Sequence, residues 1–251
     1  MPSLEGRTCF VTGANSGIGL ATAARFAREG ANIAIFARRA KENEEARALI
    51  ETHGVPCLAL QGDVTDETSV REAIAATMRR FGGLHYAFNN AGAAQSITAL
   101  VELSIAEFEH LMSVNVRGTF LGLKHMIPAI KASQGGAICN NASAAGLIPS
   151  AMQVVYAAAK FAVVGMTRGS ALECAKDGVR VNVVCPGATT GEMWGKFAAE
   201  HPERAQLALA KHPLGRVGYK EEVAEAVLFL CRDATFTTGH AFSVDGGRTA
   251  G

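Results

Sequence analysis

A tyrosine and a lysine stand four positions apart in this chain, Tyr156 and Lys160, and together could carry out acid–base chemistry. If this stretch is helical, the two side chains lie one turn apart on the same face. The reference pKa of a phenol is about 10, which is too high for proton exchange at neutral pH. An ammonium group about 4–5 Å away would favour the phenolate by about 3–4 kcal/mol, equivalent to about two to three pKa units. The pair therefore indicates a general acid/base, although an ordinary helix surface could supply it by chance.

A glycine-rich segment follows the first predicted strand, Thr8–Thr12. It offers a tight turn, close approach of a diphosphate, and the free N–H groups and positive dipole end of the next helix. Such a loop on its own is often just a turn. Its place between a first strand and a first helix predicts a dinucleotide site. The predicted cofactor-binding residues here are Gly13, Asn15, Ser16, Gly17, Ile18 and Gly19.

The end of the second predicted strand, Asn32–Ala37, bears on the choice of cofactor. An acidic side chain there would bind the ribose 2′-hydroxyl of NAD. The strand instead ends in Ala37, and Arg38 and Arg39 follow. The missing acid and the added guanidinium groups favour a 2′-phosphate, and so NADP(H) over NAD(H). The alternative is that the two arginines only begin a solvated, charged helix.

The third predicted strand, Cys57–Gln61, leads to two further candidate cofactor residues, Asp63 and Val64. The Asp63 carboxylate could accept a hydrogen bond from the adenine amino group. Alternatively, it only caps the helix that follows Thr65.

The elements that must position these residues alternate between strand and helix. The predicted strands are Thr8–Thr12, Asn32–Ala37, Cys57–Gln61, Leu84–Asn89, Ala137–Asn141, Arg180–Cys185 and Ala241–Val244. The predicted helices lie near Ile18–Glu29, Glu42–His53, Ser69–Phe81, Ile105–Lys131, Val155–Lys176 and Glu221–Leu230. This alternation predicts an α/β doubly wound Rossmann fold, with a seven-stranded parallel sheet covered by helices on both faces. We expect a single domain over residues 1–251. Its segment 187–219, helical around Glu192–Lys211, is a candidate substrate lid.

Several motifs follow one another in a fixed order over nearly the whole chain. They are the glycine loop, Asn89-Asn90-Ala91-Gly92, Ser143, the Tyr156/Lys160 pair, and a carboxy-terminal passage from Pro213-Leu214-Gly215-Arg216 to Val244-Asp245-Gly246-Gly247. Matched together in this order, they make the chain resemble a short-chain dehydrogenase/reductase.

The resemblance implies four catalytic residues. Tyr156 is the general acid/base, and Lys160 holds the nicotinamide ribose hydroxyls and lowers the pKa of the tyrosine. Ser143 hydrogen-bonds the substrate oxygen, unless it is only a turn residue. Asn115 kinks its helix and holds a water that links Lys160 to solvent, unless it is only a polar residue inside a helix. In this division of labour the cofactor carries the hydride and the protein supplies the proton.

The resemblance also implies further contacts with the cofactor. Asn90, Ala91 and Gly92 lie on the cofactor side after the fourth strand, whereas for Asn89 we favour a structural role. Pro186 and Gly187 face the nicotinamide, and Thr189 presents its backbone to the carboxamide.

One position departs from the family pattern, because Gly191 stands where many relatives have a threonine that binds the carboxamide. Either Thr189 or Thr190 takes this part, or the lid is held less firmly on the cofactor.

Three apolar side chains of the predicted lid, Met193, Trp194 and Phe197, recur at helical spacing. They line an apolar substrate pocket, or they pack the lid on the core or on a neighbouring subunit. The seven histidines form no catalytic constellation, and we interpret them as surface or helix-end residues.

Bulk properties exclude several classes of protein. A net charge of +1 without a basic run indicates neither a nucleic-acid nor a membrane partner. The amino terminus lacks a signal-peptide layout, and no apolar segment approaches the ~20 residues of a membrane span. The six cysteines show no CxxC pair and no histidine at metal-ligand spacing. They predict buried free thiols, no metal site and a cytoplasmic location.

The resemblance implies an NADP(H)-dependent oxidoreductase that interconverts a ketone and a secondary alcohol by hydride transfer. A 3-oxoacyl thioester is one candidate among small-molecule carbonyl substrates. The alternatives are the same reaction with NAD(H), a catalytically silent dinucleotide-binding sensor, and a methyltransferase on a similar sheet. The resemblance also implies a homotetramer or homodimer, with the helices Glu107–Lys131 and Val155–Lys176 at one interface.

Overall fold

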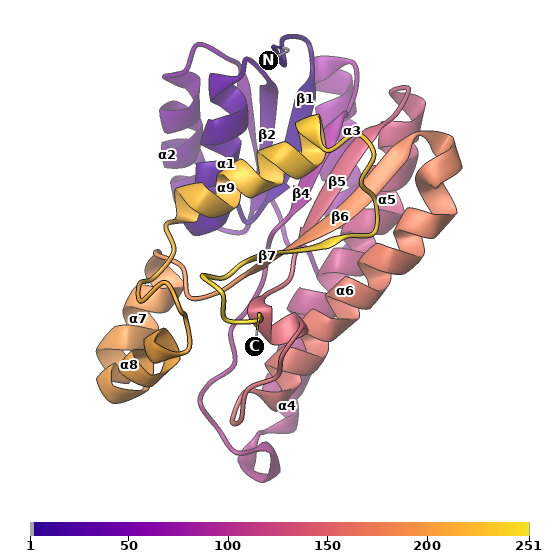
Figure 1. Cartoon of the computed structure of the whole chain (residues 1–251). Helices are drawn as coiled ribbons and strands as arrows, with labels where there is room; N and C mark the ends of the chain where they lie inside the picture. Colours follow the sequence, from indigo (N-terminus) through magenta and orange to yellow (C-terminus); the bar gives the residue numbers. More distant parts are fainter. Residues whose placement is uncertain (1–2, 251) are drawn as a thin grey trace.

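The computed structural model describes residues 3–250, which fold around a parallel sheet of seven strands in the order β3-β2-β1-β4-β5-β6-β7 (Figure 1). The strands are β1 (Thr8–Thr12), β2 (Asn32–Ala37), β3 (Cys57–Gln61), β4 (Tyr86–Asn89), β5 (Gly136–Asn141), β6 (Val179–Pro186) and β7 (Ala241–Val244). The predicted Rossmann fold and seven-stranded parallel sheet are confirmed. Strand ends differ by no more than a few residues; β4, for example, begins at Tyr86 instead of Leu84.

Helices connect the strands and cover both faces of the sheet. Within residues 3–250 the α-helices are α1 (Gly17–Arg28), α2 (Ala40–Glu51), α3 (Glu67–Phe81), α4 (Ile105–Met112), α5 (Gly118–Ala132), α6 (Val154–Cys174), α7 (Glu192–Glu200), α8 (Pro202–Ala210) and α9 (Lys220–Leu228). None of these described helices has the length and apolar character needed to cross a membrane.

Side chains that alternate along β1 divide the core into two layers. Cys9 and Val11 pack on one face, with Phe26 of α1 and Val227 of α9. Phe10 packs on the other face, in the cluster that includes Met126 of α5. Because successive strand residues point to opposite faces, a strand covered on both sides is buried along its whole length, as β1 is, and its central residues 9–11 are apolar.

The long helix predicted over Ile105–Lys131 is interrupted. Residues Ser113–Arg117 form a π-helical turn between α4 and α5. The Asn115 amide lies inside this turn and donates to the Leu111 carbonyl at 3.1 Å. A side chain that inserts into the hydrogen-bond ladder is a recognised cause of such a break.

The helical segment predicted around Glu192–Lys211 is also divided into two helices, α7 and α8. Pro202 is the first residue of α8, and His201 lies between the two helices in a non-helical conformation. Proline is favoured at the first helical position because it has no N–H to pair. In Figure 1 the two helices project from the body of the domain below α9.

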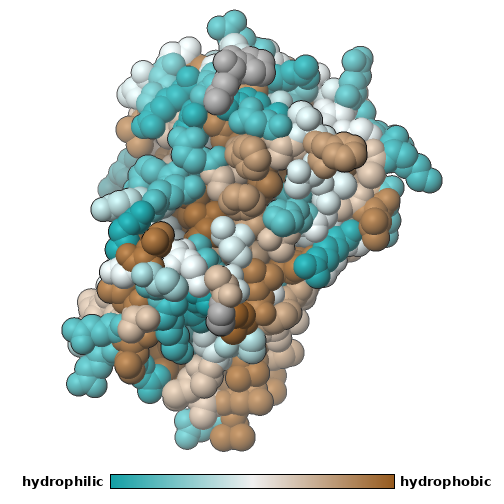
Figure 2. Space-filling view, viewed as in Figure 1, coloured by the Kyte–Doolittle hydropathy of each residue, from teal (hydrophilic) through white to brown (hydrophobic). Residues whose placement is uncertain are grey.

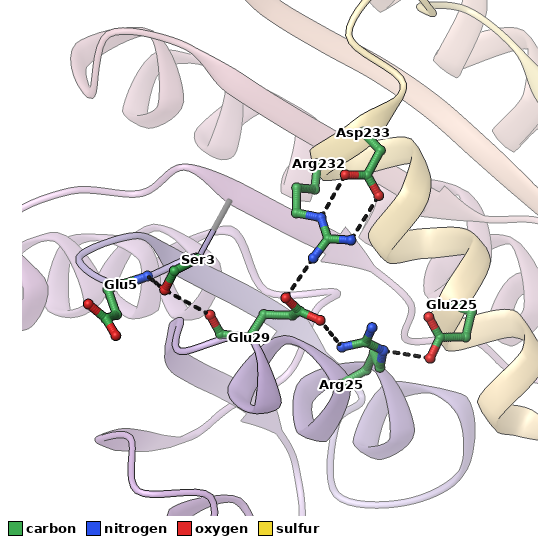
Figure 3. A network of polar contacts seen from close by, with 7 residues as sticks. All are labelled: Ser3, Glu5, Arg25, Glu29, Glu225, Arg232 and Asp233. Atoms are coloured by element: carbon green, nitrogen blue, oxygen red, sulfur yellow. Dashed lines mark hydrogen bonds and ion pairs between the residues drawn. The ribbon is translucent and has the colours of Figure 1, made fainter. Parts of the chain in front are cut away.

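A network of charged side chains fastens α1 to the carboxy-terminal part of the chain (Figure 3). Arg25 pairs with Glu29 at 2.6 Å and with Glu225 of α9 at 2.5 Å. Arg232, a buried residue just beyond α9, pairs with Glu29 and Asp233, each at 2.7 Å. The carboxylate of Glu29 therefore links two guanidinium groups that come from opposite ends of the sequence.

The strand order reverses at β1, which lies between β2 on one side and β4 on the other. In open parallel sheets, ligands bind in the crevice outside the carboxyl ends of strands at such a switch point. The predicted cofactor and catalytic residues follow the carboxyl ends of β1, β2, β3, β4, β5 and β6. The topology therefore brings residues that are far apart in the sequence to one edge of the sheet.

Candidate active site

The loop between β1 and α1 is shaped to receive phosphate. Gly13 and Gly17 adopt φ values of +63° and +57°, in the left-handed region that favours glycine. A Cβ at Gly19 would fall within contact distance of the Gly13 carbonyl and 2.6 Å from Asn90 Nδ2. The N-cap residue Ser16 makes no side-chain cap, so its hydroxyl leaves the first N–H groups of α1 free. This arrangement fits the diphosphate of a dinucleotide.

Asn90 holds this loop in place. Its Nδ2 donates to the carbonyls of Thr12 at 2.9 Å and Gly13 at 3.1 Å, and its Oδ1 accepts from Asn141 Nδ2 at 2.9 Å. The hydroxyl of Thr12 accepts from the backbone N–H groups of Asn90 and Ala91, both at 2.9 Å. Since the Asn90 amide is committed to these bonds, only the backbone of residues 90–92 is left for the predicted contact with a cofactor.

The arginines after β2 lie next to the glycine loop. Arg39 Nη2 donates to Asn15 Oδ1 at 3.4 Å, and Arg39 also lies 3.4 Å from Glu42 and 4.0 Å from Glu192. Arg38 is exposed and has no ion pair with any residue of the range 3–250. The end of β2 therefore presents one unpaired guanidinium and no carboxylate of its own.

Asp63 does not cap a helix, so that alternative is wrong. Its Oδ1 accepts from the backbone N–H and the hydroxyl of Thr65, both at 2.9 Å. The cap of α3 is Asp66, which accepts from the N–H groups of Thr68 and Ser69. Val64, the neighbouring candidate, is buried against Gly118 at the start of α5.

The catalytic candidates converge at the carboxyl ends of β5 and β4. Tyr156 and Lys160 lie on consecutive turns of α6, with Lys160 Nζ 5.6 Å from the centre of the tyrosine ring. The buried Lys160 ammonium donates to the Asn141 carbonyl at 2.9 Å. Ser143, two residues after β5, accepts from the Ala145 N–H at 3.1 Å and is hydrogen-bonded to the Tyr156 phenol.

The expected lowering of the tyrosine pKa by lysine is wrong for this structure. Burial raises the pKa of Tyr156 above its ordinary value, and the hydrogen bond with Ser143 lowers it only in part. Burial also lowers the pKa of Lys160, to about 8. Both groups lose water that would stabilise their charged forms, and for Tyr156 this loss outweighs the hydrogen bond with Ser143. The phenol is therefore protonated at neutral pH.

Asn115 and Lys160 face each other across Gly92. A Cβ built on Gly92 would lie 2.9 Å from Asn115 Oδ1 and 3.4 Å from Lys160 Nζ. The Asn115 side chain also grips the neighbouring Ala93, donating to its carbonyl at 2.9 Å and accepting from its N–H at 3.2 Å. The π turn therefore places the Asn115 amide against Gly92 and Ala93, and Gly92 lies between this amide and Lys160.

Two hydrogen bonds fix the backbone of Gly187 and Ala188, directly after β6. Gly187 N–H donates to Val244 of β7 at 3.0 Å, and Ala188 N–H donates to His212 Nε2 at 3.0 Å. The other ring nitrogen of His212, Nδ1, lies 2.8 Å from the Ala208 carbonyl. With Nδ1 protonated and Nε2 free to accept, the neutral imidazole satisfies both contacts. His212 lies directly after the C-cap of α8, as a helix-end residue, but it is buried and so is not a surface residue.

The hydroxyls proposed to replace the missing threonine have internal partners. Thr189 Oγ1 donates to the Gly187 carbonyl at 3.1 Å, and Thr190 Oγ1 accepts from the Lys220 N–H at 3.1 Å. Gly191 itself has φ of +148°, which L side chains rarely adopt. A glycine at this position therefore suits the backbone that leads into α7.

The apolar side chains of the predicted lid do not pack on the core. No residue of α7 is buried, and Met193 is 57 % exposed. The Trp194 and Phe197 rings contact each other in a tilted arrangement with centroids 5.4 Å apart, and the centroids of the Phe197 and His201 rings are 5.8 Å apart. These contacts favour a substrate pocket or a subunit contact over packing on the core.

One buried side chain that contacts the catalytic residues was missed. Gln95 Oε1 accepts from the Tyr156 N–H at 2.8 Å. Because 61 positions separate the two residues, no local sequence pattern points to this contact. All six cysteines are buried free thiols, as expected. The described residues contain no cluster of three or more histidine, cysteine and acidic side chains suited to a metal ion.

Comparison with known proteins gives the same assignment over the full chain. A family model described as enoyl-(acyl carrier protein) reductase matches residues 13–249. The chain is 39 % identical over 253 residues to 2,5-dichloro-2,5-cyclohexadiene-1,4-diol dehydrogenase of Sphingobium indicum, with 100 % of both chains covered. It is 36 % identical to cyclohexanol dehydrogenase of an Acinetobacter species, with 97 % of this chain and 95 % of the relative covered.

Solved structures agree closely. L-Sorbose reductase from Gluconobacter frateurii, complexed with NADPH and L-sorbose, superposes with a TM-score of 0.93 at 30 % identity and covers 100 % of this chain and 99 % of its own. The 3-ketoacyl-(acyl-carrier-protein) reductase from Brucella melitensis, complexed with NADH, has a TM-score of 0.90 at 32 % identity and covers 98 % and 100 %. The chain is therefore a member of the short-chain dehydrogenase/reductase family and an oxidoreductase acting on CH–OH groups with a nicotinamide dinucleotide.

Proposed function

We propose that this protein is an NADP(H)-dependent oxidoreductase that interconverts a ketone and a secondary alcohol. The observation that carries the proposal is the convergence of Tyr156, Ser143 and Lys160 at the sheet edge that also bears the glycine loop. A phenol held by a serine hydroxyl can give its proton to a carbonyl oxygen and take it back from an alcohol. A nicotinamide dinucleotide, with its diphosphate at the glycine loop, would supply the hydride.

Each remaining residue of the site has a role in this scheme. Ser143 hydrogen-bonds the substrate oxygen as well as the phenol, and so sets the distance between them. Lys160 holds the ribose hydroxyls, and its positive charge stabilises the phenolate formed in reduction. Asn115 fixes the segment beside the lysine and holds a water that links Lys160 to solvent. Pro186, Gly187 and Thr189 border the nicotinamide.

The protonated phenol suits the reductive direction at neutral pH. Because burial raises the pKa of Tyr156, the phenol is ready to donate, whereas alcohol oxidation needs the phenolate. The oxidation rate should therefore rise with pH through the alkaline range, and the reduction rate should fall.

The decisive experiment is a Tyr156→Phe variant, assayed with a panel of cyclohexanone, cyclohexanol, an open-chain ketone and a 3-oxoacyl thioester. The relatives named above act on cyclic alcohols and on 3-ketoacyl groups, so the panel covers both. The reaction is followed at the nicotinamide absorbance band with NADPH and NADH. The variant should bind cofactor like the wild type and lose nearly all turnover. Near-normal turnover would contradict the assignment of Tyr156 as the proton donor, and cofactor binding without any turnover by the wild type would favour a sensor.

The preference for NADP(H) is carried by the end of β2. Ala37 supplies no carboxylate for a 2′-hydroxyl, and the unpaired Arg38 suits a 2′-phosphate. Arg38→Ala should weaken NADPH binding at least tenfold and change NADH binding little. Arg47→Ala is the matched control, since this α2 arginine pairs with Glu44 and Glu51 on the surface. A wild type that binds NADH more tightly than NADPH would contradict the proposal.

The chain forms one domain over residues 1–251, in which segment 187–219 serves as the substrate lid. Trp194 and Phe197 of α7, in contact with each other and only partly exposed, would form its apolar lining together with Met193. Six buried free thiols suit a reducing, cytoplasmic setting.

A homotetramer or homodimer is proposed from an exposed apolar surface. Ile105 and Phe108 of α4 and Phe161 and Leu172 of α6 are all exposed. Figure 2 shows hydrophobic surface running down the side of the molecule where Figure 1 places α6 and α4. Contact between subunits would shield these apolar side chains from water. Sedimentation velocity tests the proposal, and a monomer of 26.2 kDa would contradict it.

A further inference from the structure

Helix α6, which carries Tyr156, begins without a cap of its own. Its N-cap residue Gln153 makes no side-chain cap. The preceding residue Met152 has φ of +64°, an uncommon conformation for a side chain other than glycine. The first N–H groups of any helix lack partners within it and are usually satisfied from outside. The start of α6 therefore depends on contacts supplied by another part of the chain.

Gln95 supplies that contact. Its Oε1 accepts from the Tyr156 N–H at 2.8 Å, and its Nε2 donates to the Met152 carbonyl at 3.4 Å. One amide thus spans the turn that leads into α6. Gln95 is 5 % exposed, so water does not compete for these bonds. The N–H that it binds belongs to the residue that carries the phenol.

The segment around Gln95 is itself held from the opposite side. Asn115 binds both backbone groups of Ala93, two residues earlier. Thr98 N–H, three residues later, donates to the same Met152 carbonyl at 3.3 Å. Residues 93–98 therefore form a strap between the π turn and the first turn of α6. Gln95 is the member of this strap that binds Tyr156 directly.

We propose that Gln95 is a positioning residue that sets the place of the Tyr156 phenol through the backbone of the tyrosine. The inference rests on the proposed function, since it assigns to Tyr156 the proton transfer. Proton transfer requires donor and acceptor within hydrogen-bond reach, and a misplacement of 1 Å can lower a rate by about 10²-fold. Gln95 acts on this distance without touching the reacting atoms.

The test compares two variants at this position with a matched control. Gln95→Met keeps the length of the side chain and removes both hydrogen bonds. Gln95→Glu keeps the acceptor for the Tyr156 N–H and adds a negative charge. The control is Asn182→Leu, because the buried Asn182 amide on β6 also donates to one carbonyl, that of Thr237, and accepts from one N–H, that of His240.

Each variant is examined by thermal unfolding, by NADPH binding, and by kcat and KM with the best substrate of the panel. Gln95→Met should lower kcat by about 10- to 100-fold, while NADPH affinity stays within about twofold of the wild type. Asn182→Leu should lower the melting temperature and leave kcat within about twofold. Gln95→Glu should recover part of the lost kcat. Its charge should raise the pKa of the phenol and move the alkaline rise of the oxidation rate to higher pH, a shift that Asn182→Leu should not show.

The proposal is overturned if Gln95→Met keeps kcat within about twofold of the wild type. It is also overturned if Asn182→Leu loses as much kcat as Gln95→Met, because the loss would then follow general stability. If Gln95→Met does not fold, the test depends on Gln95→Glu. A shift of the alkaline rise of its oxidation rate to higher pH supports the proposal, and the absence of this shift overturns it. Failure of the proposed function would be seen separately, as full activity in Tyr156→Phe.

Discussion

Lys160 should destabilise the fold at neutral pH, and replacing it by methionine should reveal by how much. Burial lowers the pKa of Lys160 from 10.5 to about 8. Between these two pH values the unfolded chain binds a proton that the folded protein does not, so stability rises with pH. Below pH 8 the folded protein carries the full cost of a buried ammonium. That cost is about 3 kcal/mol at pH 7 and about 1.5 kcal/mol at pH 9.5.

The Lys160→Met variant removes this cost together with the hydrogen bond to the Asn141 carbonyl. The lost bond lowers stability by the same amount at every pH, whereas the charge matters less as the pH rises. The stability of Lys160→Met relative to the wild type should therefore fall by about 2 kcal/mol between pH 7 and pH 9.5. The variant should also be inactive, because it lacks the cation proposed to bind the ribose.

Urea unfolding without cofactor at the two pH values measures this difference. Lys41→Met is the matched control, since the Lys41 side chain is 86 % exposed and pairs only loosely with Glu45 at 3.8 Å. Its stability relative to the wild type should not change with pH. A difference for Lys160→Met that is constant to within about 0.5 kcal/mol would refute the reasoning, because the lysine would then carry no burial penalty.

Three further predictions concern Gly92, Arg180 and His212. Gly92→Ala should lower turnover at least tenfold in steady-state assays, because its Cβ would lie 2.9 Å from Asn115 Oδ1. Unchanged turnover would show that the backbone around residue 92 can move to accept the methyl group. Arg180 donates to four backbone carbonyls in residues 230–237, so Arg180→Met should lose about 3 kcal/mol in urea unfolding. A decrease in the free energy of unfolding of less than about 1 kcal/mol would contradict a stabilising role for these four hydrogen bonds. His212→Leu should raise the Kd for NADPH about tenfold, and His212→Gln should raise it less, since glutamine can still accept from the Ala188 N–H. Equal NADPH affinities of His212→Leu and the wild type would show that the hydrogen bond to Ala188 does not support cofactor binding.

The sequence was sufficient to predict the sheet because its strands are buried on both faces. The run Val181–Cys185 is apolar except for Asn182, β1 is apolar between its two terminal threonines, and glycine turns separate both from helices. The ordered motifs then placed the candidate residues at the ends of these strands. Both inferences depend on neighbours along the chain, where sequence patterns are informative.

The parts that the sequence did not predict depend on contacts between distant residues. The resemblance implied a kink at Asn115, but not the contact of its side chain with Ala93, 22 positions away. The cap on α6 comes from Gln95. The tyrosine pKa was misjudged for a related reason: the predicted attraction of Lys160 used the spacing within one helix, whereas desolvation depends on everything packed around the pair.

The charge network between α1 and α9 has a consequence for biosynthesis. Arg25 and Glu225 lie 200 positions apart, and Val223 and Val227 of α9 cover the same core layer as Phe26 of α1. A ribosome releases α1 about 200 positions before α9, so the apolar side of α1 lacks this cover while the intervening chain is synthesised. This core layer is therefore completed only after α9 has been synthesised, and a chain truncated before α9 would expose an aggregation-prone surface.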